Sequence, residues 1–325
     1  MQTQVQVMPA QGQALQARTT QEEYDGLLDA FISQYSAKES SRRTYRRSLR
    51  QYFTWLQATG RDLKTLSKAD ILAYASYLLP EDEDAQDKSS LTAASYLTAV
   101  KLFYKFVADA LAYPNIAAGV KLPKRGHRFE KEALEADEAA ALVKEVAENA
   151  TPRDAAIINL LIRNGLRTIE VCRANVGDLQ TKGGRTILAL KGKGRDDRND
   201  FVILGDKCRE AVEAYLATRG RNLTAREPLF TATSYNNPGG RLTTRTITGI
   251  AKTHLKAIGL DSRKYTAHSL RHTMATLLLE ATDDLEAVQE ACRHRSSDTT
   301  KIYAYHREDR RRLKAARETM LDTIF

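Results

Sequence analysis

The chain has 325 residues, of which 50 are lysine or arginine and 41 are aspartate or glutamate, so its net charge is +9 at pH 7. This length predicts two domains, and the basic balance favours a polyanionic partner. No apolar run reaches the roughly 18 residues of a membrane span, and no glycine-rich nucleotide loop is present, which argues against a membrane protein and an ATP-driven machine.

The N-terminus and the cysteines indicate the compartment. Residues 1–20 are polar and rich in glutamine, without the basic and apolar regions of a signal peptide, so we expect a disordered lead-in. The cysteines are odd in number and lack metal-ligand spacing; they are Cys172, Cys208 and Cys292. They predict ordinary thiols in the reducing cytoplasm and no metal site.

Residues 21–120 predict a compact bundle of four or five helices. Apolar residues recur with helical spacing from Tyr24 to Tyr35, and a second helix is expected over residues 41–56. A third helix is expected to begin at Ser67 and a fourth at Ser89 or Ser90, with the acidic segment 81–84 as a break between them. No residue of this bundle is typical of a catalytic site.

One face of the second helix carries a stripe of arginines. The ordinary interpretation of such a stripe is a solvated basic face. Four arginines without an interleaved acid would also suit contacts with a phosphate backbone. The four residues, hereafter the arginine stripe, are Arg43, Arg46, Arg47 and Arg50.

A basic segment over residues 121–128 follows the bundle. It contains Pro and Gly and lacks periodicity, so we interpret it as the interdomain linker. Its lysines and arginine would suit a segment lying along DNA, namely Lys121, Lys124 and Arg125.

The second half opens with helical patterns over residues 133–146 and 155–161. The latter breaks at Asn164-Gly165, and Arg167 follows with Glu170 three residues later. An arginine just after a rigid helix and a glycine turn would be held at a fixed place, where Glu170 is close enough to orient it. A helix-capping arginine with a local ion pair is the ordinary alternative.

Two short strands are expected next, over residues 186–191 and 201–204, because both segments are rich in β-branched and apolar residues. The loop between them carries Lys193 between two glycines. A lysine on such a tip can reach into a groove as a cation or proton donor, although a plain surface lysine is the default. Helices are expected over residues 207–219 and 243–258.

Residues 268–303 combine chemically active side chains with an apolar helical run. The set is His268, Arg271, His272, His294 and Tyr303. Arginine presents a planar fork of donors to two phosphate oxygens, histidine moves protons near neutral pH, and tyrosine can form a covalent intermediate. From these residues alone, both chemistry on a phosphate and an ordinary solvated or core role are open.

In order and spacing, these motifs resemble those of the tyrosine recombinases, a family of DNA integrases and Xer-type resolvases. The resemblance covers residues 21–325 and rests on Asn-Gly-Leu-Arg167-Thr-Ile-Glu170, Gly-Lys193-Gly, His268-Ser-Leu-Arg271-His272, and His294 followed by Thr299-Thr-Lys-Ile-Tyr303. It implies a mainly α-helical fold with a small β-hairpin sheet. A helical core-binding domain (21–120), a linker (121–128) and a catalytic domain with a C-terminal helix (129–325) would form a C-shaped clamp on DNA.

The resemblance also implies a site-specific recombinase that needs no cofactor. The arginines would clamp the scissile phosphate, the tyrosine would form a 3′-phosphotyrosine, and the lysine would protonate the departing 5′ oxygen. Strand exchange would pass through a Holliday junction, with four protomers on two double-stranded DNA sites. The implied catalytic residues are Arg167, Lys193, His268, Arg271, His294 and Tyr303, with Glu170 and His272 in support.

Some features leave alternatives open. Cys292-Arg293 stands where the family commonly has Leu-Gly, which puts the turn before His294 in question. The expected hairpin loop is rich in aspartate, so Lys191 is an alternative to the glycine-flanked lysine. Tyr305 is a second tyrosine near the expected nucleophile, but its spacing from His294 is two residues too long. A type IB topoisomerase, which uses a similar residue set, and a DNA-binding accessory protein without catalysis are the competing functions.

Overall fold

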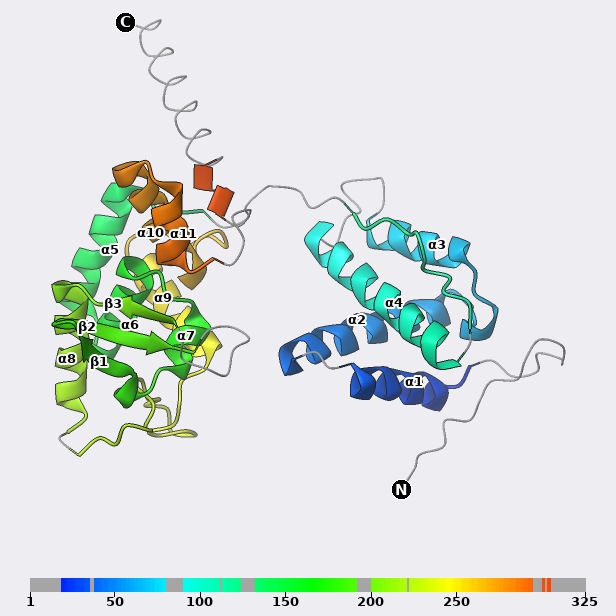
Figure 1. Ribbon diagram of the computed structural model, residues 1–325, viewed down its shortest axis with the longest axis horizontal. Coiled ribbons are helices and arrows are strands. Elements are labelled where there is room, and N and C mark those ends of the chain that lie inside the picture. The colour runs from blue at the N-terminus through cyan, green and yellow to red at the C-terminus, as the bar shows by residue number, and fades with distance from the viewer. Residues whose placement is uncertain are drawn as a thin grey trace, which may run out of the picture. The chain divides into compact units, whose positions relative to one another are not determined.

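The computed structural model describes residues 19–35, 38–79, 90–111, 113–123, 132–191, 200–220, 222–294, 300–301 and 303–304. The chain divides into two compact units, residues 1–127 and 128–325. Both units are built mainly of helices, and the second also holds a small sheet (Figure 1). The expected fold class is therefore confirmed. Within the described ranges, no helix is long and apolar enough to cross a membrane.

The first unit is a helical bundle. Its helices are α1 (Gln21–Gln34), α2 (Glu39–Ala58), α3 (Lys68–Leu78) and α4 (Ser90–Leu111), with a short 3-10 turn at Leu63–Thr65. Ser67 begins α3 through a reciprocal capping box with Asp70, as the sequence predicted. The expected break at residues 81–84 lies outside the described residues.

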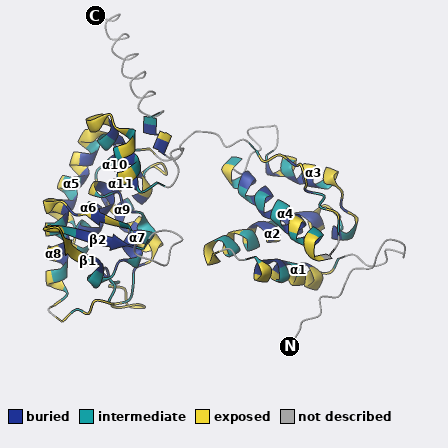
Figure 2. Cartoon of the chain, in the orientation of Figure 1, coloured by how far each residue is buried: buried dark blue, intermediate teal, exposed yellow. Residues whose placement is uncertain are grey.

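Aromatic side chains fill the core of this bundle. Phe103 of α4 meets Phe31 and Phe53 in edge-to-face contacts. The buried hydroxyls of Tyr52 and Tyr104 are hydrogen bonded to each other at 2.9 Å. Edge-to-face pairs stabilise a core beyond the area they bury, and the shared hydrogen bond satisfies two buried polar groups. Figure 2 shows the buried residues of α2 and α4 on their inner faces.

The second unit combines its small sheet with a larger set of helices. These are α5 (Ala136–Asn149), α6 (Pro152–Arg163), α7 (Thr168–Arg173), α8 (Asp206–Thr218), α9 (Thr244–Ala257), α10 (Ala267–Thr282) and α11 (Leu285–Cys292), with a 3-10 turn at Val176–Asp178. The apolar side chains of α6 are buried along most of its length, and α5, α8, α9 and α10 all contact it. This central helix fixes the position of the turn that follows it.

The sheet is antiparallel, in the order β1-β2-β3, with β1 (Leu179–Lys182), β2 (Arg185–Leu190) and β3 (Asp200–Ile203). The two expected strands are confirmed as β2 and β3, whereas β1, which precedes them, was not predicted. Gln180, Thr181 and Lys182 are polar and exposed, so β1 lacks the apolar pattern of a strand. Gly183 and Gly184 close the β1–β2 hairpin, both with positive φ, the conformation that a tight hairpin turn requires.

The apolar helical run expected after His268 consists of two helices. Asp283 ends α10 in the left-handed conformation, with φ 54°. Asp284 then begins α11 by accepting hydrogen bonds from the backbone of Glu286 and Ala287. The short α11 packs beside α10. Its C-terminal end therefore lies next to the helix that carries Arg271.

Candidate active site

A glycine turn positions Arg167. Gly165, which follows the C-cap residue of α6, adopts φ 57°, and a Cβ there would lie 2.1 Å from the terminal methyl of Met274. Any other residue would therefore be strained and would displace Met274. Arg167 follows at the N-cap of α7, where its side chain is 28% exposed.

Glu170 holds Arg167 by both side chain and backbone. Its Oε1 accepts a hydrogen bond from Arg167 Nη1 at 2.8 Å, and its Oε2 accepts one from the Arg167 backbone N–H at 2.7 Å. Burial alone would raise the pKa of the Glu170 carboxyl, which is 2% exposed, but Arg293 and Arg167 bring that pKa below its usual range. Glu170 is thus a buried, ionised carboxylate that orients a half-buried arginine.

Arg271 is almost fully buried on α10, with 1% of its surface exposed. Its guanidinium donates hydrogen bonds to the backbone carbonyls of Gly165 and Cys292. Burial above all lowers the pKa of Arg271 to about 10, so the side chain stays charged at neutral pH. Arg271 thereby ties the turn after α6 to the end of α11.

Two histidines lie one helical turn apart on α10. Their rings meet edge to face, with centroids 4.7 Å apart. His268 is exposed, whereas His272 is buried. The His272 ring lies 5.3 Å from the ring of Tyr303, centroid to centroid. The exposed His268 is thus the one of the two that a ligand could reach.

His294 follows α11 and stacks on Tyr303, with parallel rings whose centroids are 6.1 Å apart. Its Nδ1 is 3.0 Å from the hydroxyl oxygen of Thr300. Burial, and then the charges of Arg271 and Arg167, lower the pKa of His294 to about 4. The ring is therefore neutral at pH 7, and a neutral imidazole has one nitrogen able to accept a proton.

Tyr303 is 4% exposed and packs in a small cluster with α10 and α11. The thiol of Cys292 lies against its hydroxyl, and burial raises the pKa of Tyr303 well above its usual range. In this arrangement the hydroxyl is protonated and covered. It needs both a proton acceptor and access to the substrate before it can act as a nucleophile.

The structure brings most of the predicted catalytic set together in the second unit. Arg167, Arg271, His268, His294 and Tyr303 converge there, with Glu170 and His272 among them. Lys191, at the end of β2, is half-buried, and Lys121 is exposed in the first unit. The other candidates fall outside the described residues, namely Lys193, Lys124, Arg125 and Tyr305.

The arginine stripe has acidic neighbours that the sequence pattern did not reveal. Arg43 pairs with Glu39 at 3.3 Å, and Arg46 pairs with Asp29 of α1 at 3.0 Å. No acid is interleaved within the stripe, but two of its arginines pair with acids that lie outside it. Arg47 and Arg50 are exposed and make no ion pair within the described part of the bundle.

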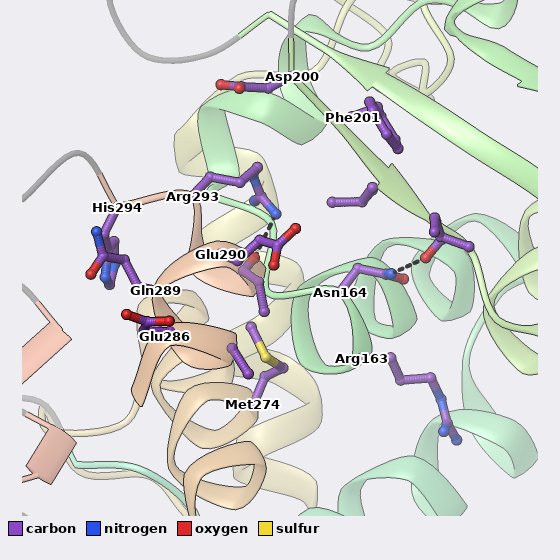
Figure 3. Close-up of a pocket in the computed structure, with 14 residues that line it drawn as sticks. Arg163, Asn164, Asp200, Phe201, Met274, Glu286, Gln289, Glu290, Arg293 and His294 are labelled. Carbon is purple, nitrogen blue, oxygen red and sulfur yellow. Dashed lines mark hydrogen bonds between the residues drawn. The ribbon is translucent and has the colours of Figure 1, made fainter. Parts of the chain in front are cut away.

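Arg293 is a residue of this site that sequence reasoning missed. Its Nη2 lies 2.9 Å from Glu170 Oε2, and its side chain is 9% exposed. The two residues are 123 positions apart, so no local pattern could have indicated the contact. Figure 3 shows Arg293 and His294 diverging from the end of α11, beside a hollow of about 1000 Å³ between α6, β3, α10 and α11. Of the predicted catalytic residues within the described ranges, only His294 lines this hollow.

Two family models match the chain: the phage integrase family over residues 132–310, and the phage integrase N-terminal SAM-like domain over residues 24–110. The chain is 32% identical to tyrosine recombinase XerD of Mycobacterium leprae over 296 residues, covering 87% of this chain and 92% of the relative. It is 33% identical to tyrosine recombinase XerC of Pelobacter propionicus over 269 residues, covering 82% and 84%.

Solved structures share the fold. XerH recombinase bound to palindromic difH substrate, in a post-cleavage complex, matches with a TM-score of 0.72 at 20% identity, over 90% of this chain and 83% of that one. A lambda integrase tetramer bound to a Holliday junction matches with a TM-score of 0.62 at 15% identity, over 86% and 76%.

The fold and the cluster of arginines, histidines and tyrosine define a DNA strand-transfer enzyme of the tyrosine class. The chain belongs to the phage integrase family of tyrosine recombinases. It is a tyrosine-type site-specific recombinase, and nothing in these matches supports a topoisomerase or a non-catalytic accessory protein.

Proposed function

We propose that this recombinase cuts and rejoins double-stranded DNA at paired sites through a 3′-phosphotyrosine at Tyr303. The observation that best supports the assignment is the position of Tyr303 between His272 and His294, beside Arg271. A tyrosine in a core needs no such neighbours, whereas a nucleophile attacking a phosphate requires cations and proton carriers at this range.

Charge supports a phosphodiester substrate. Three arginines, Arg167, Arg271 and Arg293, surround a single carboxylate, Glu170. The cluster therefore carries an excess positive charge that a phosphate would neutralise. In the proposed reaction Arg167 and Arg271 donate to its non-bridging oxygens and stabilise the charge that develops in the transition state.

The chemical step exchanges one ester for another. The Tyr303 oxygen forms a bond to phosphorus as the bond to the 5′ oxygen breaks, and the tyrosine proton passes to a histidine, for which neutral His294 and exposed His268 are the candidates. A hairpin lysine, Lys193 or Lys191, protonates the departing 5′ oxygen. Rejoining reverses these transfers, and the phosphotyrosine bond conserves the ester's energy without ATP.

The burial of the nucleophile, Tyr303, bears on how the protomers assemble on DNA. Because Tyr303 is 4% exposed, its hydroxyl has to leave the cluster with α10 and α11 before it meets DNA. We infer that four protomers on two DNA sites supply this change, and that strands pass through a Holliday junction. The lambda integrase tetramer on such a junction, a protein of the same fold, supports this inference. We place the activity in the cytoplasm, in the integration of a mobile element or the resolution of DNA dimers.

A nicked suicide duplex tests the assignment. The duplex is selected by the protein from a random-sequence library, and its nick lets the cut fragment diffuse away, so that a covalent protein–DNA band accumulates on a denaturing gel. Tyr303→Phe should abolish this band and retain binding, because only the hydroxyl is lost. Tyr305→Phe, the matched control, should retain the band. A band with Tyr303→Phe, or its absence with wild-type protein on bound DNA, would contradict the proposal.

A further inference from the structure

Arg293 ends α11 in a backbone conformation that favours glycine. Its φ is 53° and its ψ is 46°. The Arg293 N–H donates to the Glu290 carbonyl at 2.8 Å, and the His294 N–H donates to the Gln289 carbonyl at 3.0 Å, which closes the helix end. Of the described residues other than glycine, Asp283 alone shares a positive φ. A Cβ is unfavourable in this conformation, and such strain persists where the surrounding structure compensates for it.

The side chain of Arg293 supplies that compensation. Its Nη1 donates to the Ala291 carbonyl at 2.8 Å, and its Nη2 donates to Glu170 Oε2 at 2.9 Å and to the Gly165 carbonyl at 3.4 Å. In Figure 3 the Arg293 side chain extends away from the end of α11, on the side opposite to His294. Arg293 thus joins the end of α11 to the turn that precedes Arg167.

Two of the three partners of Arg293 are shared with arginines that are proposed to bind the phosphate. Glu170 Oε2 also accepts the backbone N–H of Arg167, while Oε1 accepts its Nη1. The Gly165 carbonyl also accepts a hydrogen bond from Arg271. A single guanidinium therefore contacts the groups that hold both arginines, although with 9% exposure it presents little surface to DNA itself.

We propose that Arg293 is a positioning residue for DNA cleavage: by fixing Glu170 against the turn at Gly165, it holds Arg167 in the orientation that meets the scissile phosphate. This inference rests on the proposed function. The planar fork of arginine is essential to it, because one side chain reaches Ala291, Gly165 and Glu170 at once, and the single ammonium of lysine cannot reproduce that geometry.

Arg293→Gly separates positioning from folding, because glycine suits the backbone at this position. With saturating protein on the suicide duplex, cleavage should slow about tenfold, the value of one charge-assisted hydrogen bond, while duplex affinity stays unchanged. The Arg293→Lys variant should cleave the duplex about as slowly as the glycine variant. Arg209→Ala, which removes a partly exposed arginine of α8 that pairs with Asp206 and Glu213, is the control for net charge and should cleave like wild type.

A double-mutant cycle tests the route through Glu170. If Arg293 acts by holding Glu170, the double variant Glu170→Gln/Arg293→Gly should cleave no more slowly than Glu170→Gln alone. The inference would be overturned if the slowing factors of the two single variants multiply in the double variant, or if Arg293→Gly cleaves at the wild-type rate. A melting temperature that falls together with duplex affinity would also overturn it, since that result indicates a purely structural role. If wild-type protein forms no covalent complex, the proposed function fails instead.

Discussion

Replacing Glu170 by glutamine keeps the shape of the side chain and removes its charge. The carboxylate accepts three hydrogen bonds, from the Arg167 N–H at 2.7 Å, Arg167 Nη1 at 2.8 Å and Arg293 Nη2 at 2.9 Å. A glutamine amide has one acceptor oxygen, and its NH₂ would face another donor, so at least one guanidinium loses its partner.

The loss of stability follows from burial. Removing one member of a buried ion pair costs about 3–5 kcal/mol. Because the Arg167 side chain is 28% exposed and stays partly hydrated, we expect the lower end, about 3 kcal/mol. For a unit of this size, that loss corresponds to a fall in melting temperature of roughly 6–12 °C. Cleavage should slow about 100-fold, because Arg167 no longer has a fixed orientation toward the developing charge.

Thermal denaturation and single-turnover cleavage of the suicide duplex measure the two effects. Glu213→Gln is the matched control, since Glu213 on α8 also pairs with an arginine, Arg209, at 3.1 Å, but is 52% exposed. An exposed pair contributes little, so this variant should melt and cleave like wild type. If both glutamine variants behave alike, Glu170 does not organise the site and the reasoning is refuted.

Arg167→Ala and Arg271→Ala should each slow cleavage by two or more orders of magnitude, because a preorganised donor at a developing charge contributes about 3–4 kcal/mol; a near-normal rate removes that arginine from the site. For the arginine stripe, replacing all four residues by Gln should weaken binding to every duplex, and each lost phosphate contact should lower the log–log salt slope by about one unit. Most of that change should come from Arg47 and Arg50, which make no ion pair with the described residues. An unchanged slope, measured by fluorescence anisotropy, would indicate that the stripe is a solvated face. His294→Gln should make the stability of the fold less sensitive to acid. The pKa of His294 is about 4 in the folded protein and 6.5 in a free histidine. The unfolded chain therefore binds the proton first, and wild-type stability is lost as pH falls from 6.5 toward 4. After a discount for the half-buried ring, the loss by pH 5 is about 1 kcal/mol, and equal melting shifts from pH 7 to pH 5 in both proteins would contradict it.

Short-range sequence signals predicted many of the helices and turns of this protein. The capping box at Ser67, the apolar spacing of the helices and the glycine turn before Arg167 are short-range signals, each written within a few residues. The order and spacing of the arginine, histidine and tyrosine motifs identified the family, because proteins of one fold carry their active-site side chains at corresponding points along the chain. The strand β1 was not predicted because Leu179 is its only apolar residue and the other three are polar and exposed.

Tertiary structure alone decided how those side chains meet. Arg293 looked like a bulky departure before His294, yet its backbone closes α11 and its guanidinium reaches Glu170, 123 positions away. Asp29 likewise reaches the arginine stripe from another helix. The burial of Tyr303 depends on how α10 and α11 pack. Ion pairs and burial depend on distances in space, and the packing of whole helices sets those distances across separations that no local pattern encodes.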